Sequence, residues 1–310
     1  MVPSMDEYVL GIDIGGTNLR MGTVTKDGVL SNFERKSSAA LLKENASGNL
    51  VNEINAYIDR YHLQKQVIGI CVGVPATVRK DKSFIFSAPN LHGLQNIDLG
   101  RLIQEGTGIP TIVDRDVYYL LMYDIVTMNL DPNHDKTILG IYIGTGIGNA
   151  IYIDGKVYVG KNGVAGELGH IPMYHNNEAC MCGNRGCAEV VCSGLKLEKL
   201  AKETFTDCRI RDIFQKHGDS PEIKEFIDTL SLPAATEITL LDPDFVIIGG
   251  GVTMMKNFPL DDFLDAIRAH TRHPMPAESI NFLKSEESQT NGVIGGAYAT
   301  FDTLKQYYNS

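Results

Sequence analysis

A histidine and three cysteines lie close together in the sequence and could bind one metal ion: His170, Cys180, Cys182 and Cys187. One imidazole and three thiolates are a suitable ligand set for tetrahedral zinc, and glycines between the last two cysteines permit a tight turn. The alternative interpretation, unpaired buried cysteines, fits the isolated Cys71, Cys192 and Cys208. The Cys-x-Cys-Gly-x-x-Gly-Cys spacing predicts a zinc site instead. Four protein ligands leave no position for water, so we expect a structural metal.

A second pattern with chemical potential is a glycine-rich turn that occurs twice, each time after an apolar strand. LGIDIGGTNLR runs from Leu10 to Arg20, and LGIYIGTGIG runs from Leu139 to Gly148. Each copy continues into a second apolar segment and an Asp-Gly turn, which predicts a three-stranded meander. The repetition predicts two similarly built halves.

The glycines of these turns, with a third cluster in VIIGGGV, are candidates for phosphate binding. Glycine lacks a Cβ atom, so backbone N–H groups in such turns can approach an anion closely, and threonine hydroxyls add donors. One glycine cluster alone is more often a tight turn, but three clusters favour a nucleotide, although none has P-loop or dinucleotide-binding spacing. The candidates are Gly15, Gly16, Thr17, Asn18, Gly144, Thr145, Gly146, Gly148, Gly249, Gly250 and Gly251.

A carboxylate that could act as a base follows the strand expected at residues 111–113. Asp116 in PTIVDRDVYYL could accept the proton of a hydroxyl group as a phosphoryl group is transferred to it. Asp116 or its neighbour Asp114 could equally cap the helix expected to begin at Val117. The residues alone leave both interpretations open, and the two roles are compatible.

Composition excludes several classes of protein. The chain has 310 residues and a net charge of −10, which argues against a nucleic-acid-binding surface because phosphate contacts need clustered Lys and Arg. No apolar run is long enough to cross a bilayer, and MVPSMDEYVL lacks the basic region of a signal peptide. We expect a cytoplasmic protein.

The elements that must position these residues are predicted to form two domains. We expect an N-terminal α/β domain over residues 1–113, completed by a C-terminal helix over residues 292–310. A larger α/β domain over residues 114–291 carries the zinc motif.

The hairpins, and the stretch from Gly160 to Gly194, resemble the ROK family of repressors, open reading frames and kinases. The resemblance extends from Gly11 to the Gly-Gly-Ala near Gly295. It implies an actin-like ATPase (ribonuclease H-like) fold of two α/β domains with an active-site cleft between them, where the two hairpins hold one ATP. It also implies a sugar kinase that uses Mg²⁺ with ATP, phosphorylates a hexose and forms a homodimer.

The resemblance assigns roles to individual residues. It implies that Asp116 is the catalytic base and that Asp13 approaches the magnesium ion through water. Residues matching Asn90, Glu167, His170 and Glu189 contact the sugar in the family, and the histidine also binds zinc, using one ring nitrogen for each. His175 is a rival zinc ligand, but its position does not match the family's.

Two residues depart from the family pattern. Arg115 stands where most family glucokinases have an asparagine that contacts the sugar, and Tyr118 replaces another asparagine. Arg-Asp-Val at this point, with GVPATVRKDKSF, SAPNL and RHPMP, resembles the family's bacterial D-allose kinases. We therefore expect phosphorylation of the 6-hydroxyl of an aldohexose, D-allose being the best candidate, with Arg115 among the substrate-binding residues.

Other functions remain as alternatives. N-acetylmannosamine kinase and glucokinase are the nearest within the family. A sugar-responsive regulator is the alternative from another class, but family repressors carry an N-terminal helix-turn-helix domain for which we expect no room before Tyr8. A binding module without catalysis would not need Asp116, Asp13 or the glycine turns.

Overall fold

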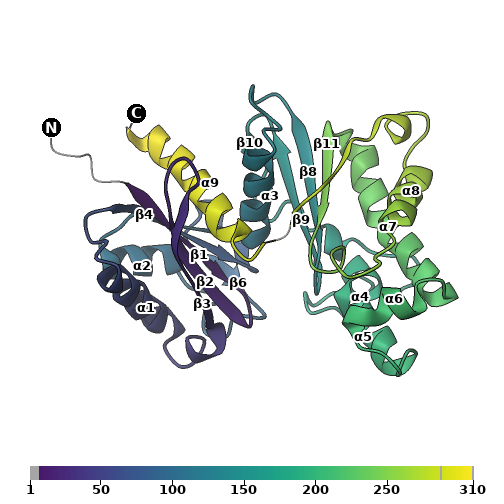
Figure 1. Cartoon of the computed structure of the whole chain (residues 1–310), viewed down its shortest axis with the longest axis horizontal. Coiled ribbons are helices and arrows are strands. Elements are labelled where there is room, and N and C mark those ends of the chain that lie inside the picture. The colour runs from purple at the N-terminus through teal and green to yellow at the C-terminus, as the bar shows by residue number, and fades with distance from the viewer. Residues whose placement is uncertain (1–6, 287, 309–310) are drawn as a thin grey trace. The chain divides into compact units, whose positions relative to one another are not determined.

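Both glycine-rich turns join antiparallel strands, as the sequence predicts (Figure 1). The first turn connects β1 (Tyr8–Ile14) with β2 (Asn18–Val24), and the second connects β8 (Thr137–Ile143) with β9 (Ile147–Ile153). A third antiparallel strand follows in each case, β3 (Leu30–Ser37) or β10 (Lys156–Val157). The predicted three-stranded meanders are thus confirmed.

The two meanders are extended by parallel strands into two sheets of the same topology. In the first sheet the order is β3-β2-β1-β4-β7, with β4 (Val67–Val74) and β7 (Thr111–Arg115) parallel to β1. In the second it is β10-β9-β8-β11-β12, with β11 (Phe245–Gly249) and β12 (Phe282–Lys284) parallel to β8. This correspondence confirms the two similarly built α/β halves.

The structure is a computed structural model that describes residues 7–286 and 288–308, and these form two units. The first unit comprises residues 7–130, 159–164 and 288–308, and the second comprises residues 131–158 and 165–286. Helix α3 (Asp116–Thr127) belongs to the first unit, whereas the sequence analysis divided the chain after Val113. The reason is its contact with α9 (Asn291–Tyr308): a Cβ atom on Gly295 would lie 1.9 Å from the carbonyl oxygen of Tyr119, so the two helices approach very closely.

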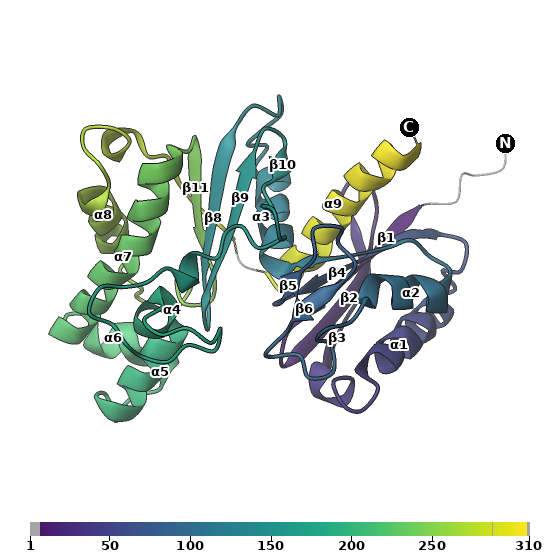
Figure 2. The same cartoon turned by 180° about the vertical axis from the view of Figure 1, so that it is seen from behind.

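In the first unit, helices cover both faces of the sheet (Figure 2). They are α1 (Ala46–Arg60), α2 (Leu99–Thr107), α3 (Asp116–Thr127) and α9 (Asn291–Tyr308). Alternate residues of β1 serve the two faces: Leu10 packs in the core with α1 and α2, and Val9 packs with α3 and α9. A short hairpin of β5 (Thr77–Val78) and β6 (Ile85–Ser87) lies beside the sheet, and η1 (Ser38–Ala40) follows β3.

In the second unit, the core lies between β8 and the long helix α7. Leu139, Ile141 and Ile143 of β8 belong to one buried cluster with Phe226 and Leu230 of α7. The helices of this unit are α4 (Ala188–Cys192), α5 (Gly194–Glu203), α6 (Ile213–His217), α7 (Pro221–Leu241) and α8 (Leu260–His270). Short turns of 3₁₀-helix are η2 (Leu168–His170), η3 (Ile210–Asp212) and η4 (Ala277–Ser279). Among the described residues, no helix is long and apolar enough to cross a membrane.

Gly250 tests how tightly the third glycine cluster is packed on β8. Its φ is 93°, and a Cβ atom would lie 2.4 Å from the backbone nitrogen of Ile143. Gly250→Ala should therefore destabilise the second unit by roughly 2–5 kcal/mol, because a strained φ and a steric clash add together. The measurement is urea unfolding followed by circular dichroism.

Gly108→Ala is the matched control. Gly108 also has a positive φ, 73°, but nothing lies within 4 Å of the added Cβ atom. Gly108→Ala should lower the free energy of unfolding only by the backbone strain, about 1–2 kcal/mol. Equal losses of unfolding free energy in the two variants would show that the contact with Ile143 is unimportant.

Candidate functional site

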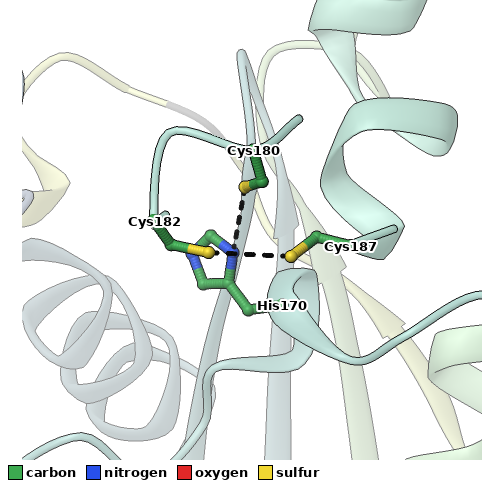
Figure 3. A group of neighbouring side chains, drawn as sticks. All are labelled: His170, Cys180, Cys182 and Cys187. Atoms are coloured by element: carbon green, nitrogen blue, oxygen red, sulfur yellow. Dashed lines mark hydrogen bonds between the residues drawn. The ribbon is translucent and has the colours of Figure 1, made fainter. Parts of the chain in front are cut away.

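The four predicted metal ligands converge on one point in the second unit (Figure 3). His170 ends η2, Cys180 and Cys182 lie in the loop that follows, and Cys187 immediately precedes α4. The Sγ atoms of Cys182 and Cys187 are 3.6 Å apart, and the Sγ atom of Cys180 is 3.6 Å from Nδ1 of His170. All four ligand atoms lie within 4.8 Å of one another.

These distances fit a tetrahedral zinc ion. Zinc–sulfur bonds of about 2.3 Å at tetrahedral angles put two sulfur atoms about 3.8 Å apart. Backbone hydrogen bonds hold the loop in this shape, from Cys180 N to Asn184 O and from Gly183 N to Cys180 O. His175 is not part of the group, and its ring contacts that of Tyr174 at a tilt, with centroids 3.8 Å apart.

The orientation of His170 leaves its second ring nitrogen for another partner. Nδ1 faces the thiols, and Nε2 lies 3.7 Å from the Oε2 atom of Glu167. Glu167 and the imidazole are both part-exposed, so polar atoms of a ligand could reach them. The structure therefore places Glu167 and His170, two of the three predicted sugar contacts of this unit, side by side. They meet at the edge of the imidazole ring that is turned away from the cysteines.

Glu189, the third predicted contact, comes from α4 and reaches the second glycine turn. Its Oε2 atom accepts a hydrogen bond from the backbone nitrogen of Ile147 at 3.1 Å. Gly146 must be glycine for this contact, because a Cβ atom there would lie 2.0 Å from that oxygen. The turn itself is closed by a hydrogen bond from Gly144 N to Gly146 O.

The third glycine cluster joins the second turn within the same unit. Gly250 packs on the backbone of Ile143, at the end of β8, and Val252 N donates to Ile143 O at 2.8 Å. Gly249 contacts the ring of Tyr142, the residue that replaces the first hairpin's aspartate. Two of the three predicted phosphate-binding clusters thus lie together.

In the first unit, the other glycine turn lies beside Asn90. A Cβ atom on Gly16 would be 3.4 Å from the backbone oxygen of Asn90. The turn is held by a hydrogen bond from Gly15 N to Asn18 O, and the Asn18 side chain donates to the hydroxyl of Thr17. The predicted phosphate-binding and sugar-binding residues of this unit are therefore neighbours.

Asp13, at the base of the same turn, forms an ion pair that the sequence analysis missed. Nη1 of Arg20 lies 2.7 Å from its Oδ2 atom. Burial raises the pKa of Asp13, although the guanidinium opposes that shift. The sequence could have predicted this ion pair. Counting outward from the glycine turn along both strands makes Asp13 and Arg20 cross-strand partners.

Asp116 is the first residue of α3, at the end of β7. Its Oδ1 atom accepts a hydrogen bond from Val117 N at 2.8 Å, so the carboxylate does bind the start of the helix. Burial and the negative charge of Asp13 raise the pKa of Asp116 to about 6, against the opposing influence of Arg115. A carboxyl group with such a pKa is well suited to accept a proton near neutral pH.

Arg115, predicted to contact the sugar, is turned onto Tyr118. Its side chain donates to the Tyr118 hydroxyl at 3.2 Å, and the guanidinium lies 5.0 Å from the centre of that ring. Arg115 is only 7% exposed, which limits what a ligand could touch. The neighbouring Asp114 is also buried and pairs with Lys82 at 3.0 Å, another contact between distant residues that the sequence analysis missed.

A second group of potential metal ligands lies elsewhere in the second unit: Asp207, Cys208 and His217. His217 Nε2 is 2.9 Å from Asp207 Oδ1, and the ring of His217 stacks on Phe205. The ammonium group of Lys216 is 3.7 Å from the same carboxylate, so this group already has a cation.

The sequence profile of the ROK family matches residues 9–302. The chain is 28% identical to a glucokinase of Halalkalibacterium halodurans, over 98% of this chain and 97% of that protein. It is 23% identical to an N-acetylmannosamine kinase of Salmonella arizonae, over 95% of this chain and 99% of that protein.

A solved structure is similar over nearly the whole chain. It is a ROK family glucokinase from Streptomyces griseus in complex with glucose and AMPPNP, with a TM-score of 0.76 and 24% identity. The similarity covers 96% of this chain and 99% of that one. It confirms the actin-like ATPase fold.

Cys187→Ser tests the zinc site. The purified wild-type protein should contain about one zinc ion per chain, and the variant should lose zinc affinity by more than roughly 100-fold, because even an outer-shell partner is worth about 10–100-fold. Stability should fall with it, since metal binding is coupled to local folding. Elemental analysis and thermal unfolding measure both.

Cys192→Ser provides the control. Cys192 is as buried as Cys187, but its thiol donates to Ala188 O and takes no part in the cluster. Serine keeps a donor there, so zinc content should remain unchanged. Wild-type protein purified without chelators and free of zinc would refute the assignment.

Proposed function

The chain belongs to the ROK family, and we propose that it transfers the γ-phosphoryl group of ATP to the 6-hydroxyl of an aldohexose, D-allose being preferred. Its enzymatic class is ATP-dependent sugar kinase. The observation that carries the proposed mechanism is the environment of Asp116, a shielded carboxyl group with a raised pKa beside the first glycine turn's Asp13.

In the proposed mechanism Asp116 is the base. Its carboxylate accepts the proton of the 6-hydroxyl as the oxygen bonds to the γ-phosphorus and the bond to ADP breaks. In a loose transition state the proton leaves late, so a weak base suffices. The bond from Val117 N orients one carboxylate oxygen and helps stabilise the charged form.

Phosphate binding is assigned to the three glycine clusters through backbone N–H groups. Mg²⁺ accompanies ATP and, when bound, neutralises charge on the phosphate oxygens. Asp13 is a suitable residue to face the magnesium ion, because carboxylate oxygen is the donor that magnesium prefers. Its Oδ2 atom is paired with Arg20. We assign Asp13 to the ion through water, as the family resemblance implies.

Sugar binding is assigned to Asn90 in the first unit and to Glu167, His170 and Glu189 in the second. The imidazole supports this assignment, because Nδ1 faces the predicted zinc ligands and Nε2 faces Glu167. Zinc would fix the ring and the tautomer, leaving Nε2 to a hydroxyl group. A homodimer and a cytoplasmic location remain predictions.

The choice of D-allose rests on Arg115 and Tyr118. The neutral side chain of asparagine can both donate and accept hydrogen bonds, whereas a guanidinium group can only donate them. With Arg115 buried against Tyr118, the pair also changes the shape and charge beside Asp116. Allose differs from glucose at one hydroxyl, and a site that leaves buried polar groups unpaired can reject an epimer strongly.

Glucose and N-acetylmannosamine are the alternative substrates, favoured by the names of the two relatives. A non-catalytic sugar-responsive regulator is the alternative from another class. The raised pKa of Asp116 argues for the kinase, because a regulator has no need of a base.

Asp116→Asn should lower kcat by about 10²–10⁴-fold while sugar binding persists, because the amide cannot accept the proton. In the wild type, kcat/KM should fall as the pH is lowered through about 6, where the carboxylate becomes protonated. A coupled ADP-release assay across pH measures both.

Asp98→Asn is the control for helix capping. Asp98 accepts from Arg101 N at the start of α2, so this variant changes a helix start without touching Asp116. It should keep wild-type kcat. An Asp116→Asn enzyme within a factor of two of wild type would exclude Asp116 as the base.

A panel of hexoses tests the substrate. We expect kcat/KM for D-allose to exceed that for glucose and N-acetylmannosamine, and Arg115→Asn to narrow the difference. Arg101→Asn, which removes an exposed ion pair with Glu105 on α2, should leave the ratio unchanged. A clear preference of the wild type for glucose would refute the choice of allose and leave the kinase assignment standing.

A further inference from the structure

Helix α4 directly links the predicted metal site to the second glycine turn. Cys187, a metal ligand, precedes the first residue of α4. Glu189, the second residue of the helix, accepts a hydrogen bond from Ile147 N. Immediately after the helix, the buried hydroxyl of Ser193 donates to the carbonyl oxygen of Thr145 at 2.8 Å.

Backbone hydrogen bonds strengthen the link at the C-terminal end of α4. Gly194 N donates to Gly144 O, and Leu195 N donates to Thr145 O, both at 3.0 Å. Gly194 lies so close that a Cβ atom would be 2.4 Å from Gly144 O. The carbonyl groups of Gly144 and Thr145 are thus held from the α4–α5 junction, while Gly144 N bonds to Gly146 O within the turn.

The first end of the link is tied to the loop of the metal ligands. Ala188 N donates to Ile171 O, next to His170, and Pro172 forms a β-bridge with Cys187. Ala188 and Cys192 are fully buried in the core with α7. A helix this short and this well packed should move as one body, so a displacement of Cys187 reaches Ser193.

We propose that α4 and Ser193 couple metal occupancy to nucleotide binding. When a bound metal holds the four ligands together, Cys187 fixes the start of α4. Glu189 and Ser193 then hold the Gly144–Gly146 turn in the shape that binds phosphate. Release of the metal frees Cys187 and loosens the turn. Glu189 and Ser193 are positioning residues here, and the inference rests on the proposed assignment of this turn to ATP.

Thermodynamic linkage gives the coupling a second, independent signature. If zinc tightens nucleotide binding by some factor, then the nucleotide must tighten zinc binding by the same factor. Couplings of this kind are typically about 5–150-fold. A zinc ion that only kept the sugar-binding loop folded would respond to sugar and not to nucleotide.

Calorimetry with Mg²⁺ and AMPPNP, without sugar, tests the first direction. We expect zinc-depleted protein to bind AMPPNP at least roughly 5-fold more weakly than zinc-loaded protein. Zinc-loaded Ser193→Ala should bind it about 3–10-fold more weakly than wild type, the value of one hydrogen bond. Zinc release to a chelator tests the reverse direction: AMPPNP should slow it in the wild type and less so in Ser193→Ala.

Ser220→Ala is the matched control. Ser193 also caps α5 by accepting from Leu195 N, and Ser220 caps α7 in the same way, through Ile223 N, within the same unit. This variant should bind AMPPNP and release zinc as the wild type does. If zinc release from the wild type is the same with and without bound AMPPNP, the coupling is refuted, even if depleted protein unfolds. If zinc-loaded wild type binds no AMPPNP, the proposed kinase function fails as well.

Discussion

A turn that binds phosphate through its backbone must keep its N–H groups uncovered, so nothing can pack in front of it to hold its shape. Support has to come from the carbonyl side and from the strands. In the second unit, Gly194, Ser193 and Leu195 bind the turn's carbonyl groups, and Gly250 packs on the strand that precedes it. The glycines permit these approaches, and the sheet topology brings the supporting segments to the same edge.

Buried charge is the second constraint on the arrangement. Asp13, Asp114 and Asp116 lie within one short region of the first unit, and each carboxylate needs compensation. Arg20 and Lys82 pair with the first two. Asp116 has the more distant influence of Arg115 and a backbone N–H group, and its pKa remains raised. Asp13 and Asp114 each pair with a cation from another part of the chain, whereas Asp116 is held through the backbone at the start of its own helix.

Local patterns predicted much of this molecule, and contacts between distant segments account for what was missed. Strand alternation and Asp-Gly turns identified both meanders, and cysteine spacing brought out a four-ligand cluster that the structure assembles. Ordinary residue types such as Lys82 and Ser193 carried no signal, because their roles arise from partners far along the chain. Helix α3 was divided from the first unit because its packing against α9 joins residues too distant for any periodicity to reveal. The turn of Arg115 onto Tyr118 likewise depends on side-chain packing.

The contact between Arg115 and Tyr118 bears on how such a site could have changed during evolution. Replacing either residue alone removes a stacked and hydrogen-bonded partner while the other remains buried. Each intermediate would lose stability before a new specificity had been gained, so the two substitutions are expected to show strong epistasis. A pair of asparagines at these positions and the present pair would then be separated by single variants of lower stability. The two side chains should therefore be exchanged together when the site is redesigned.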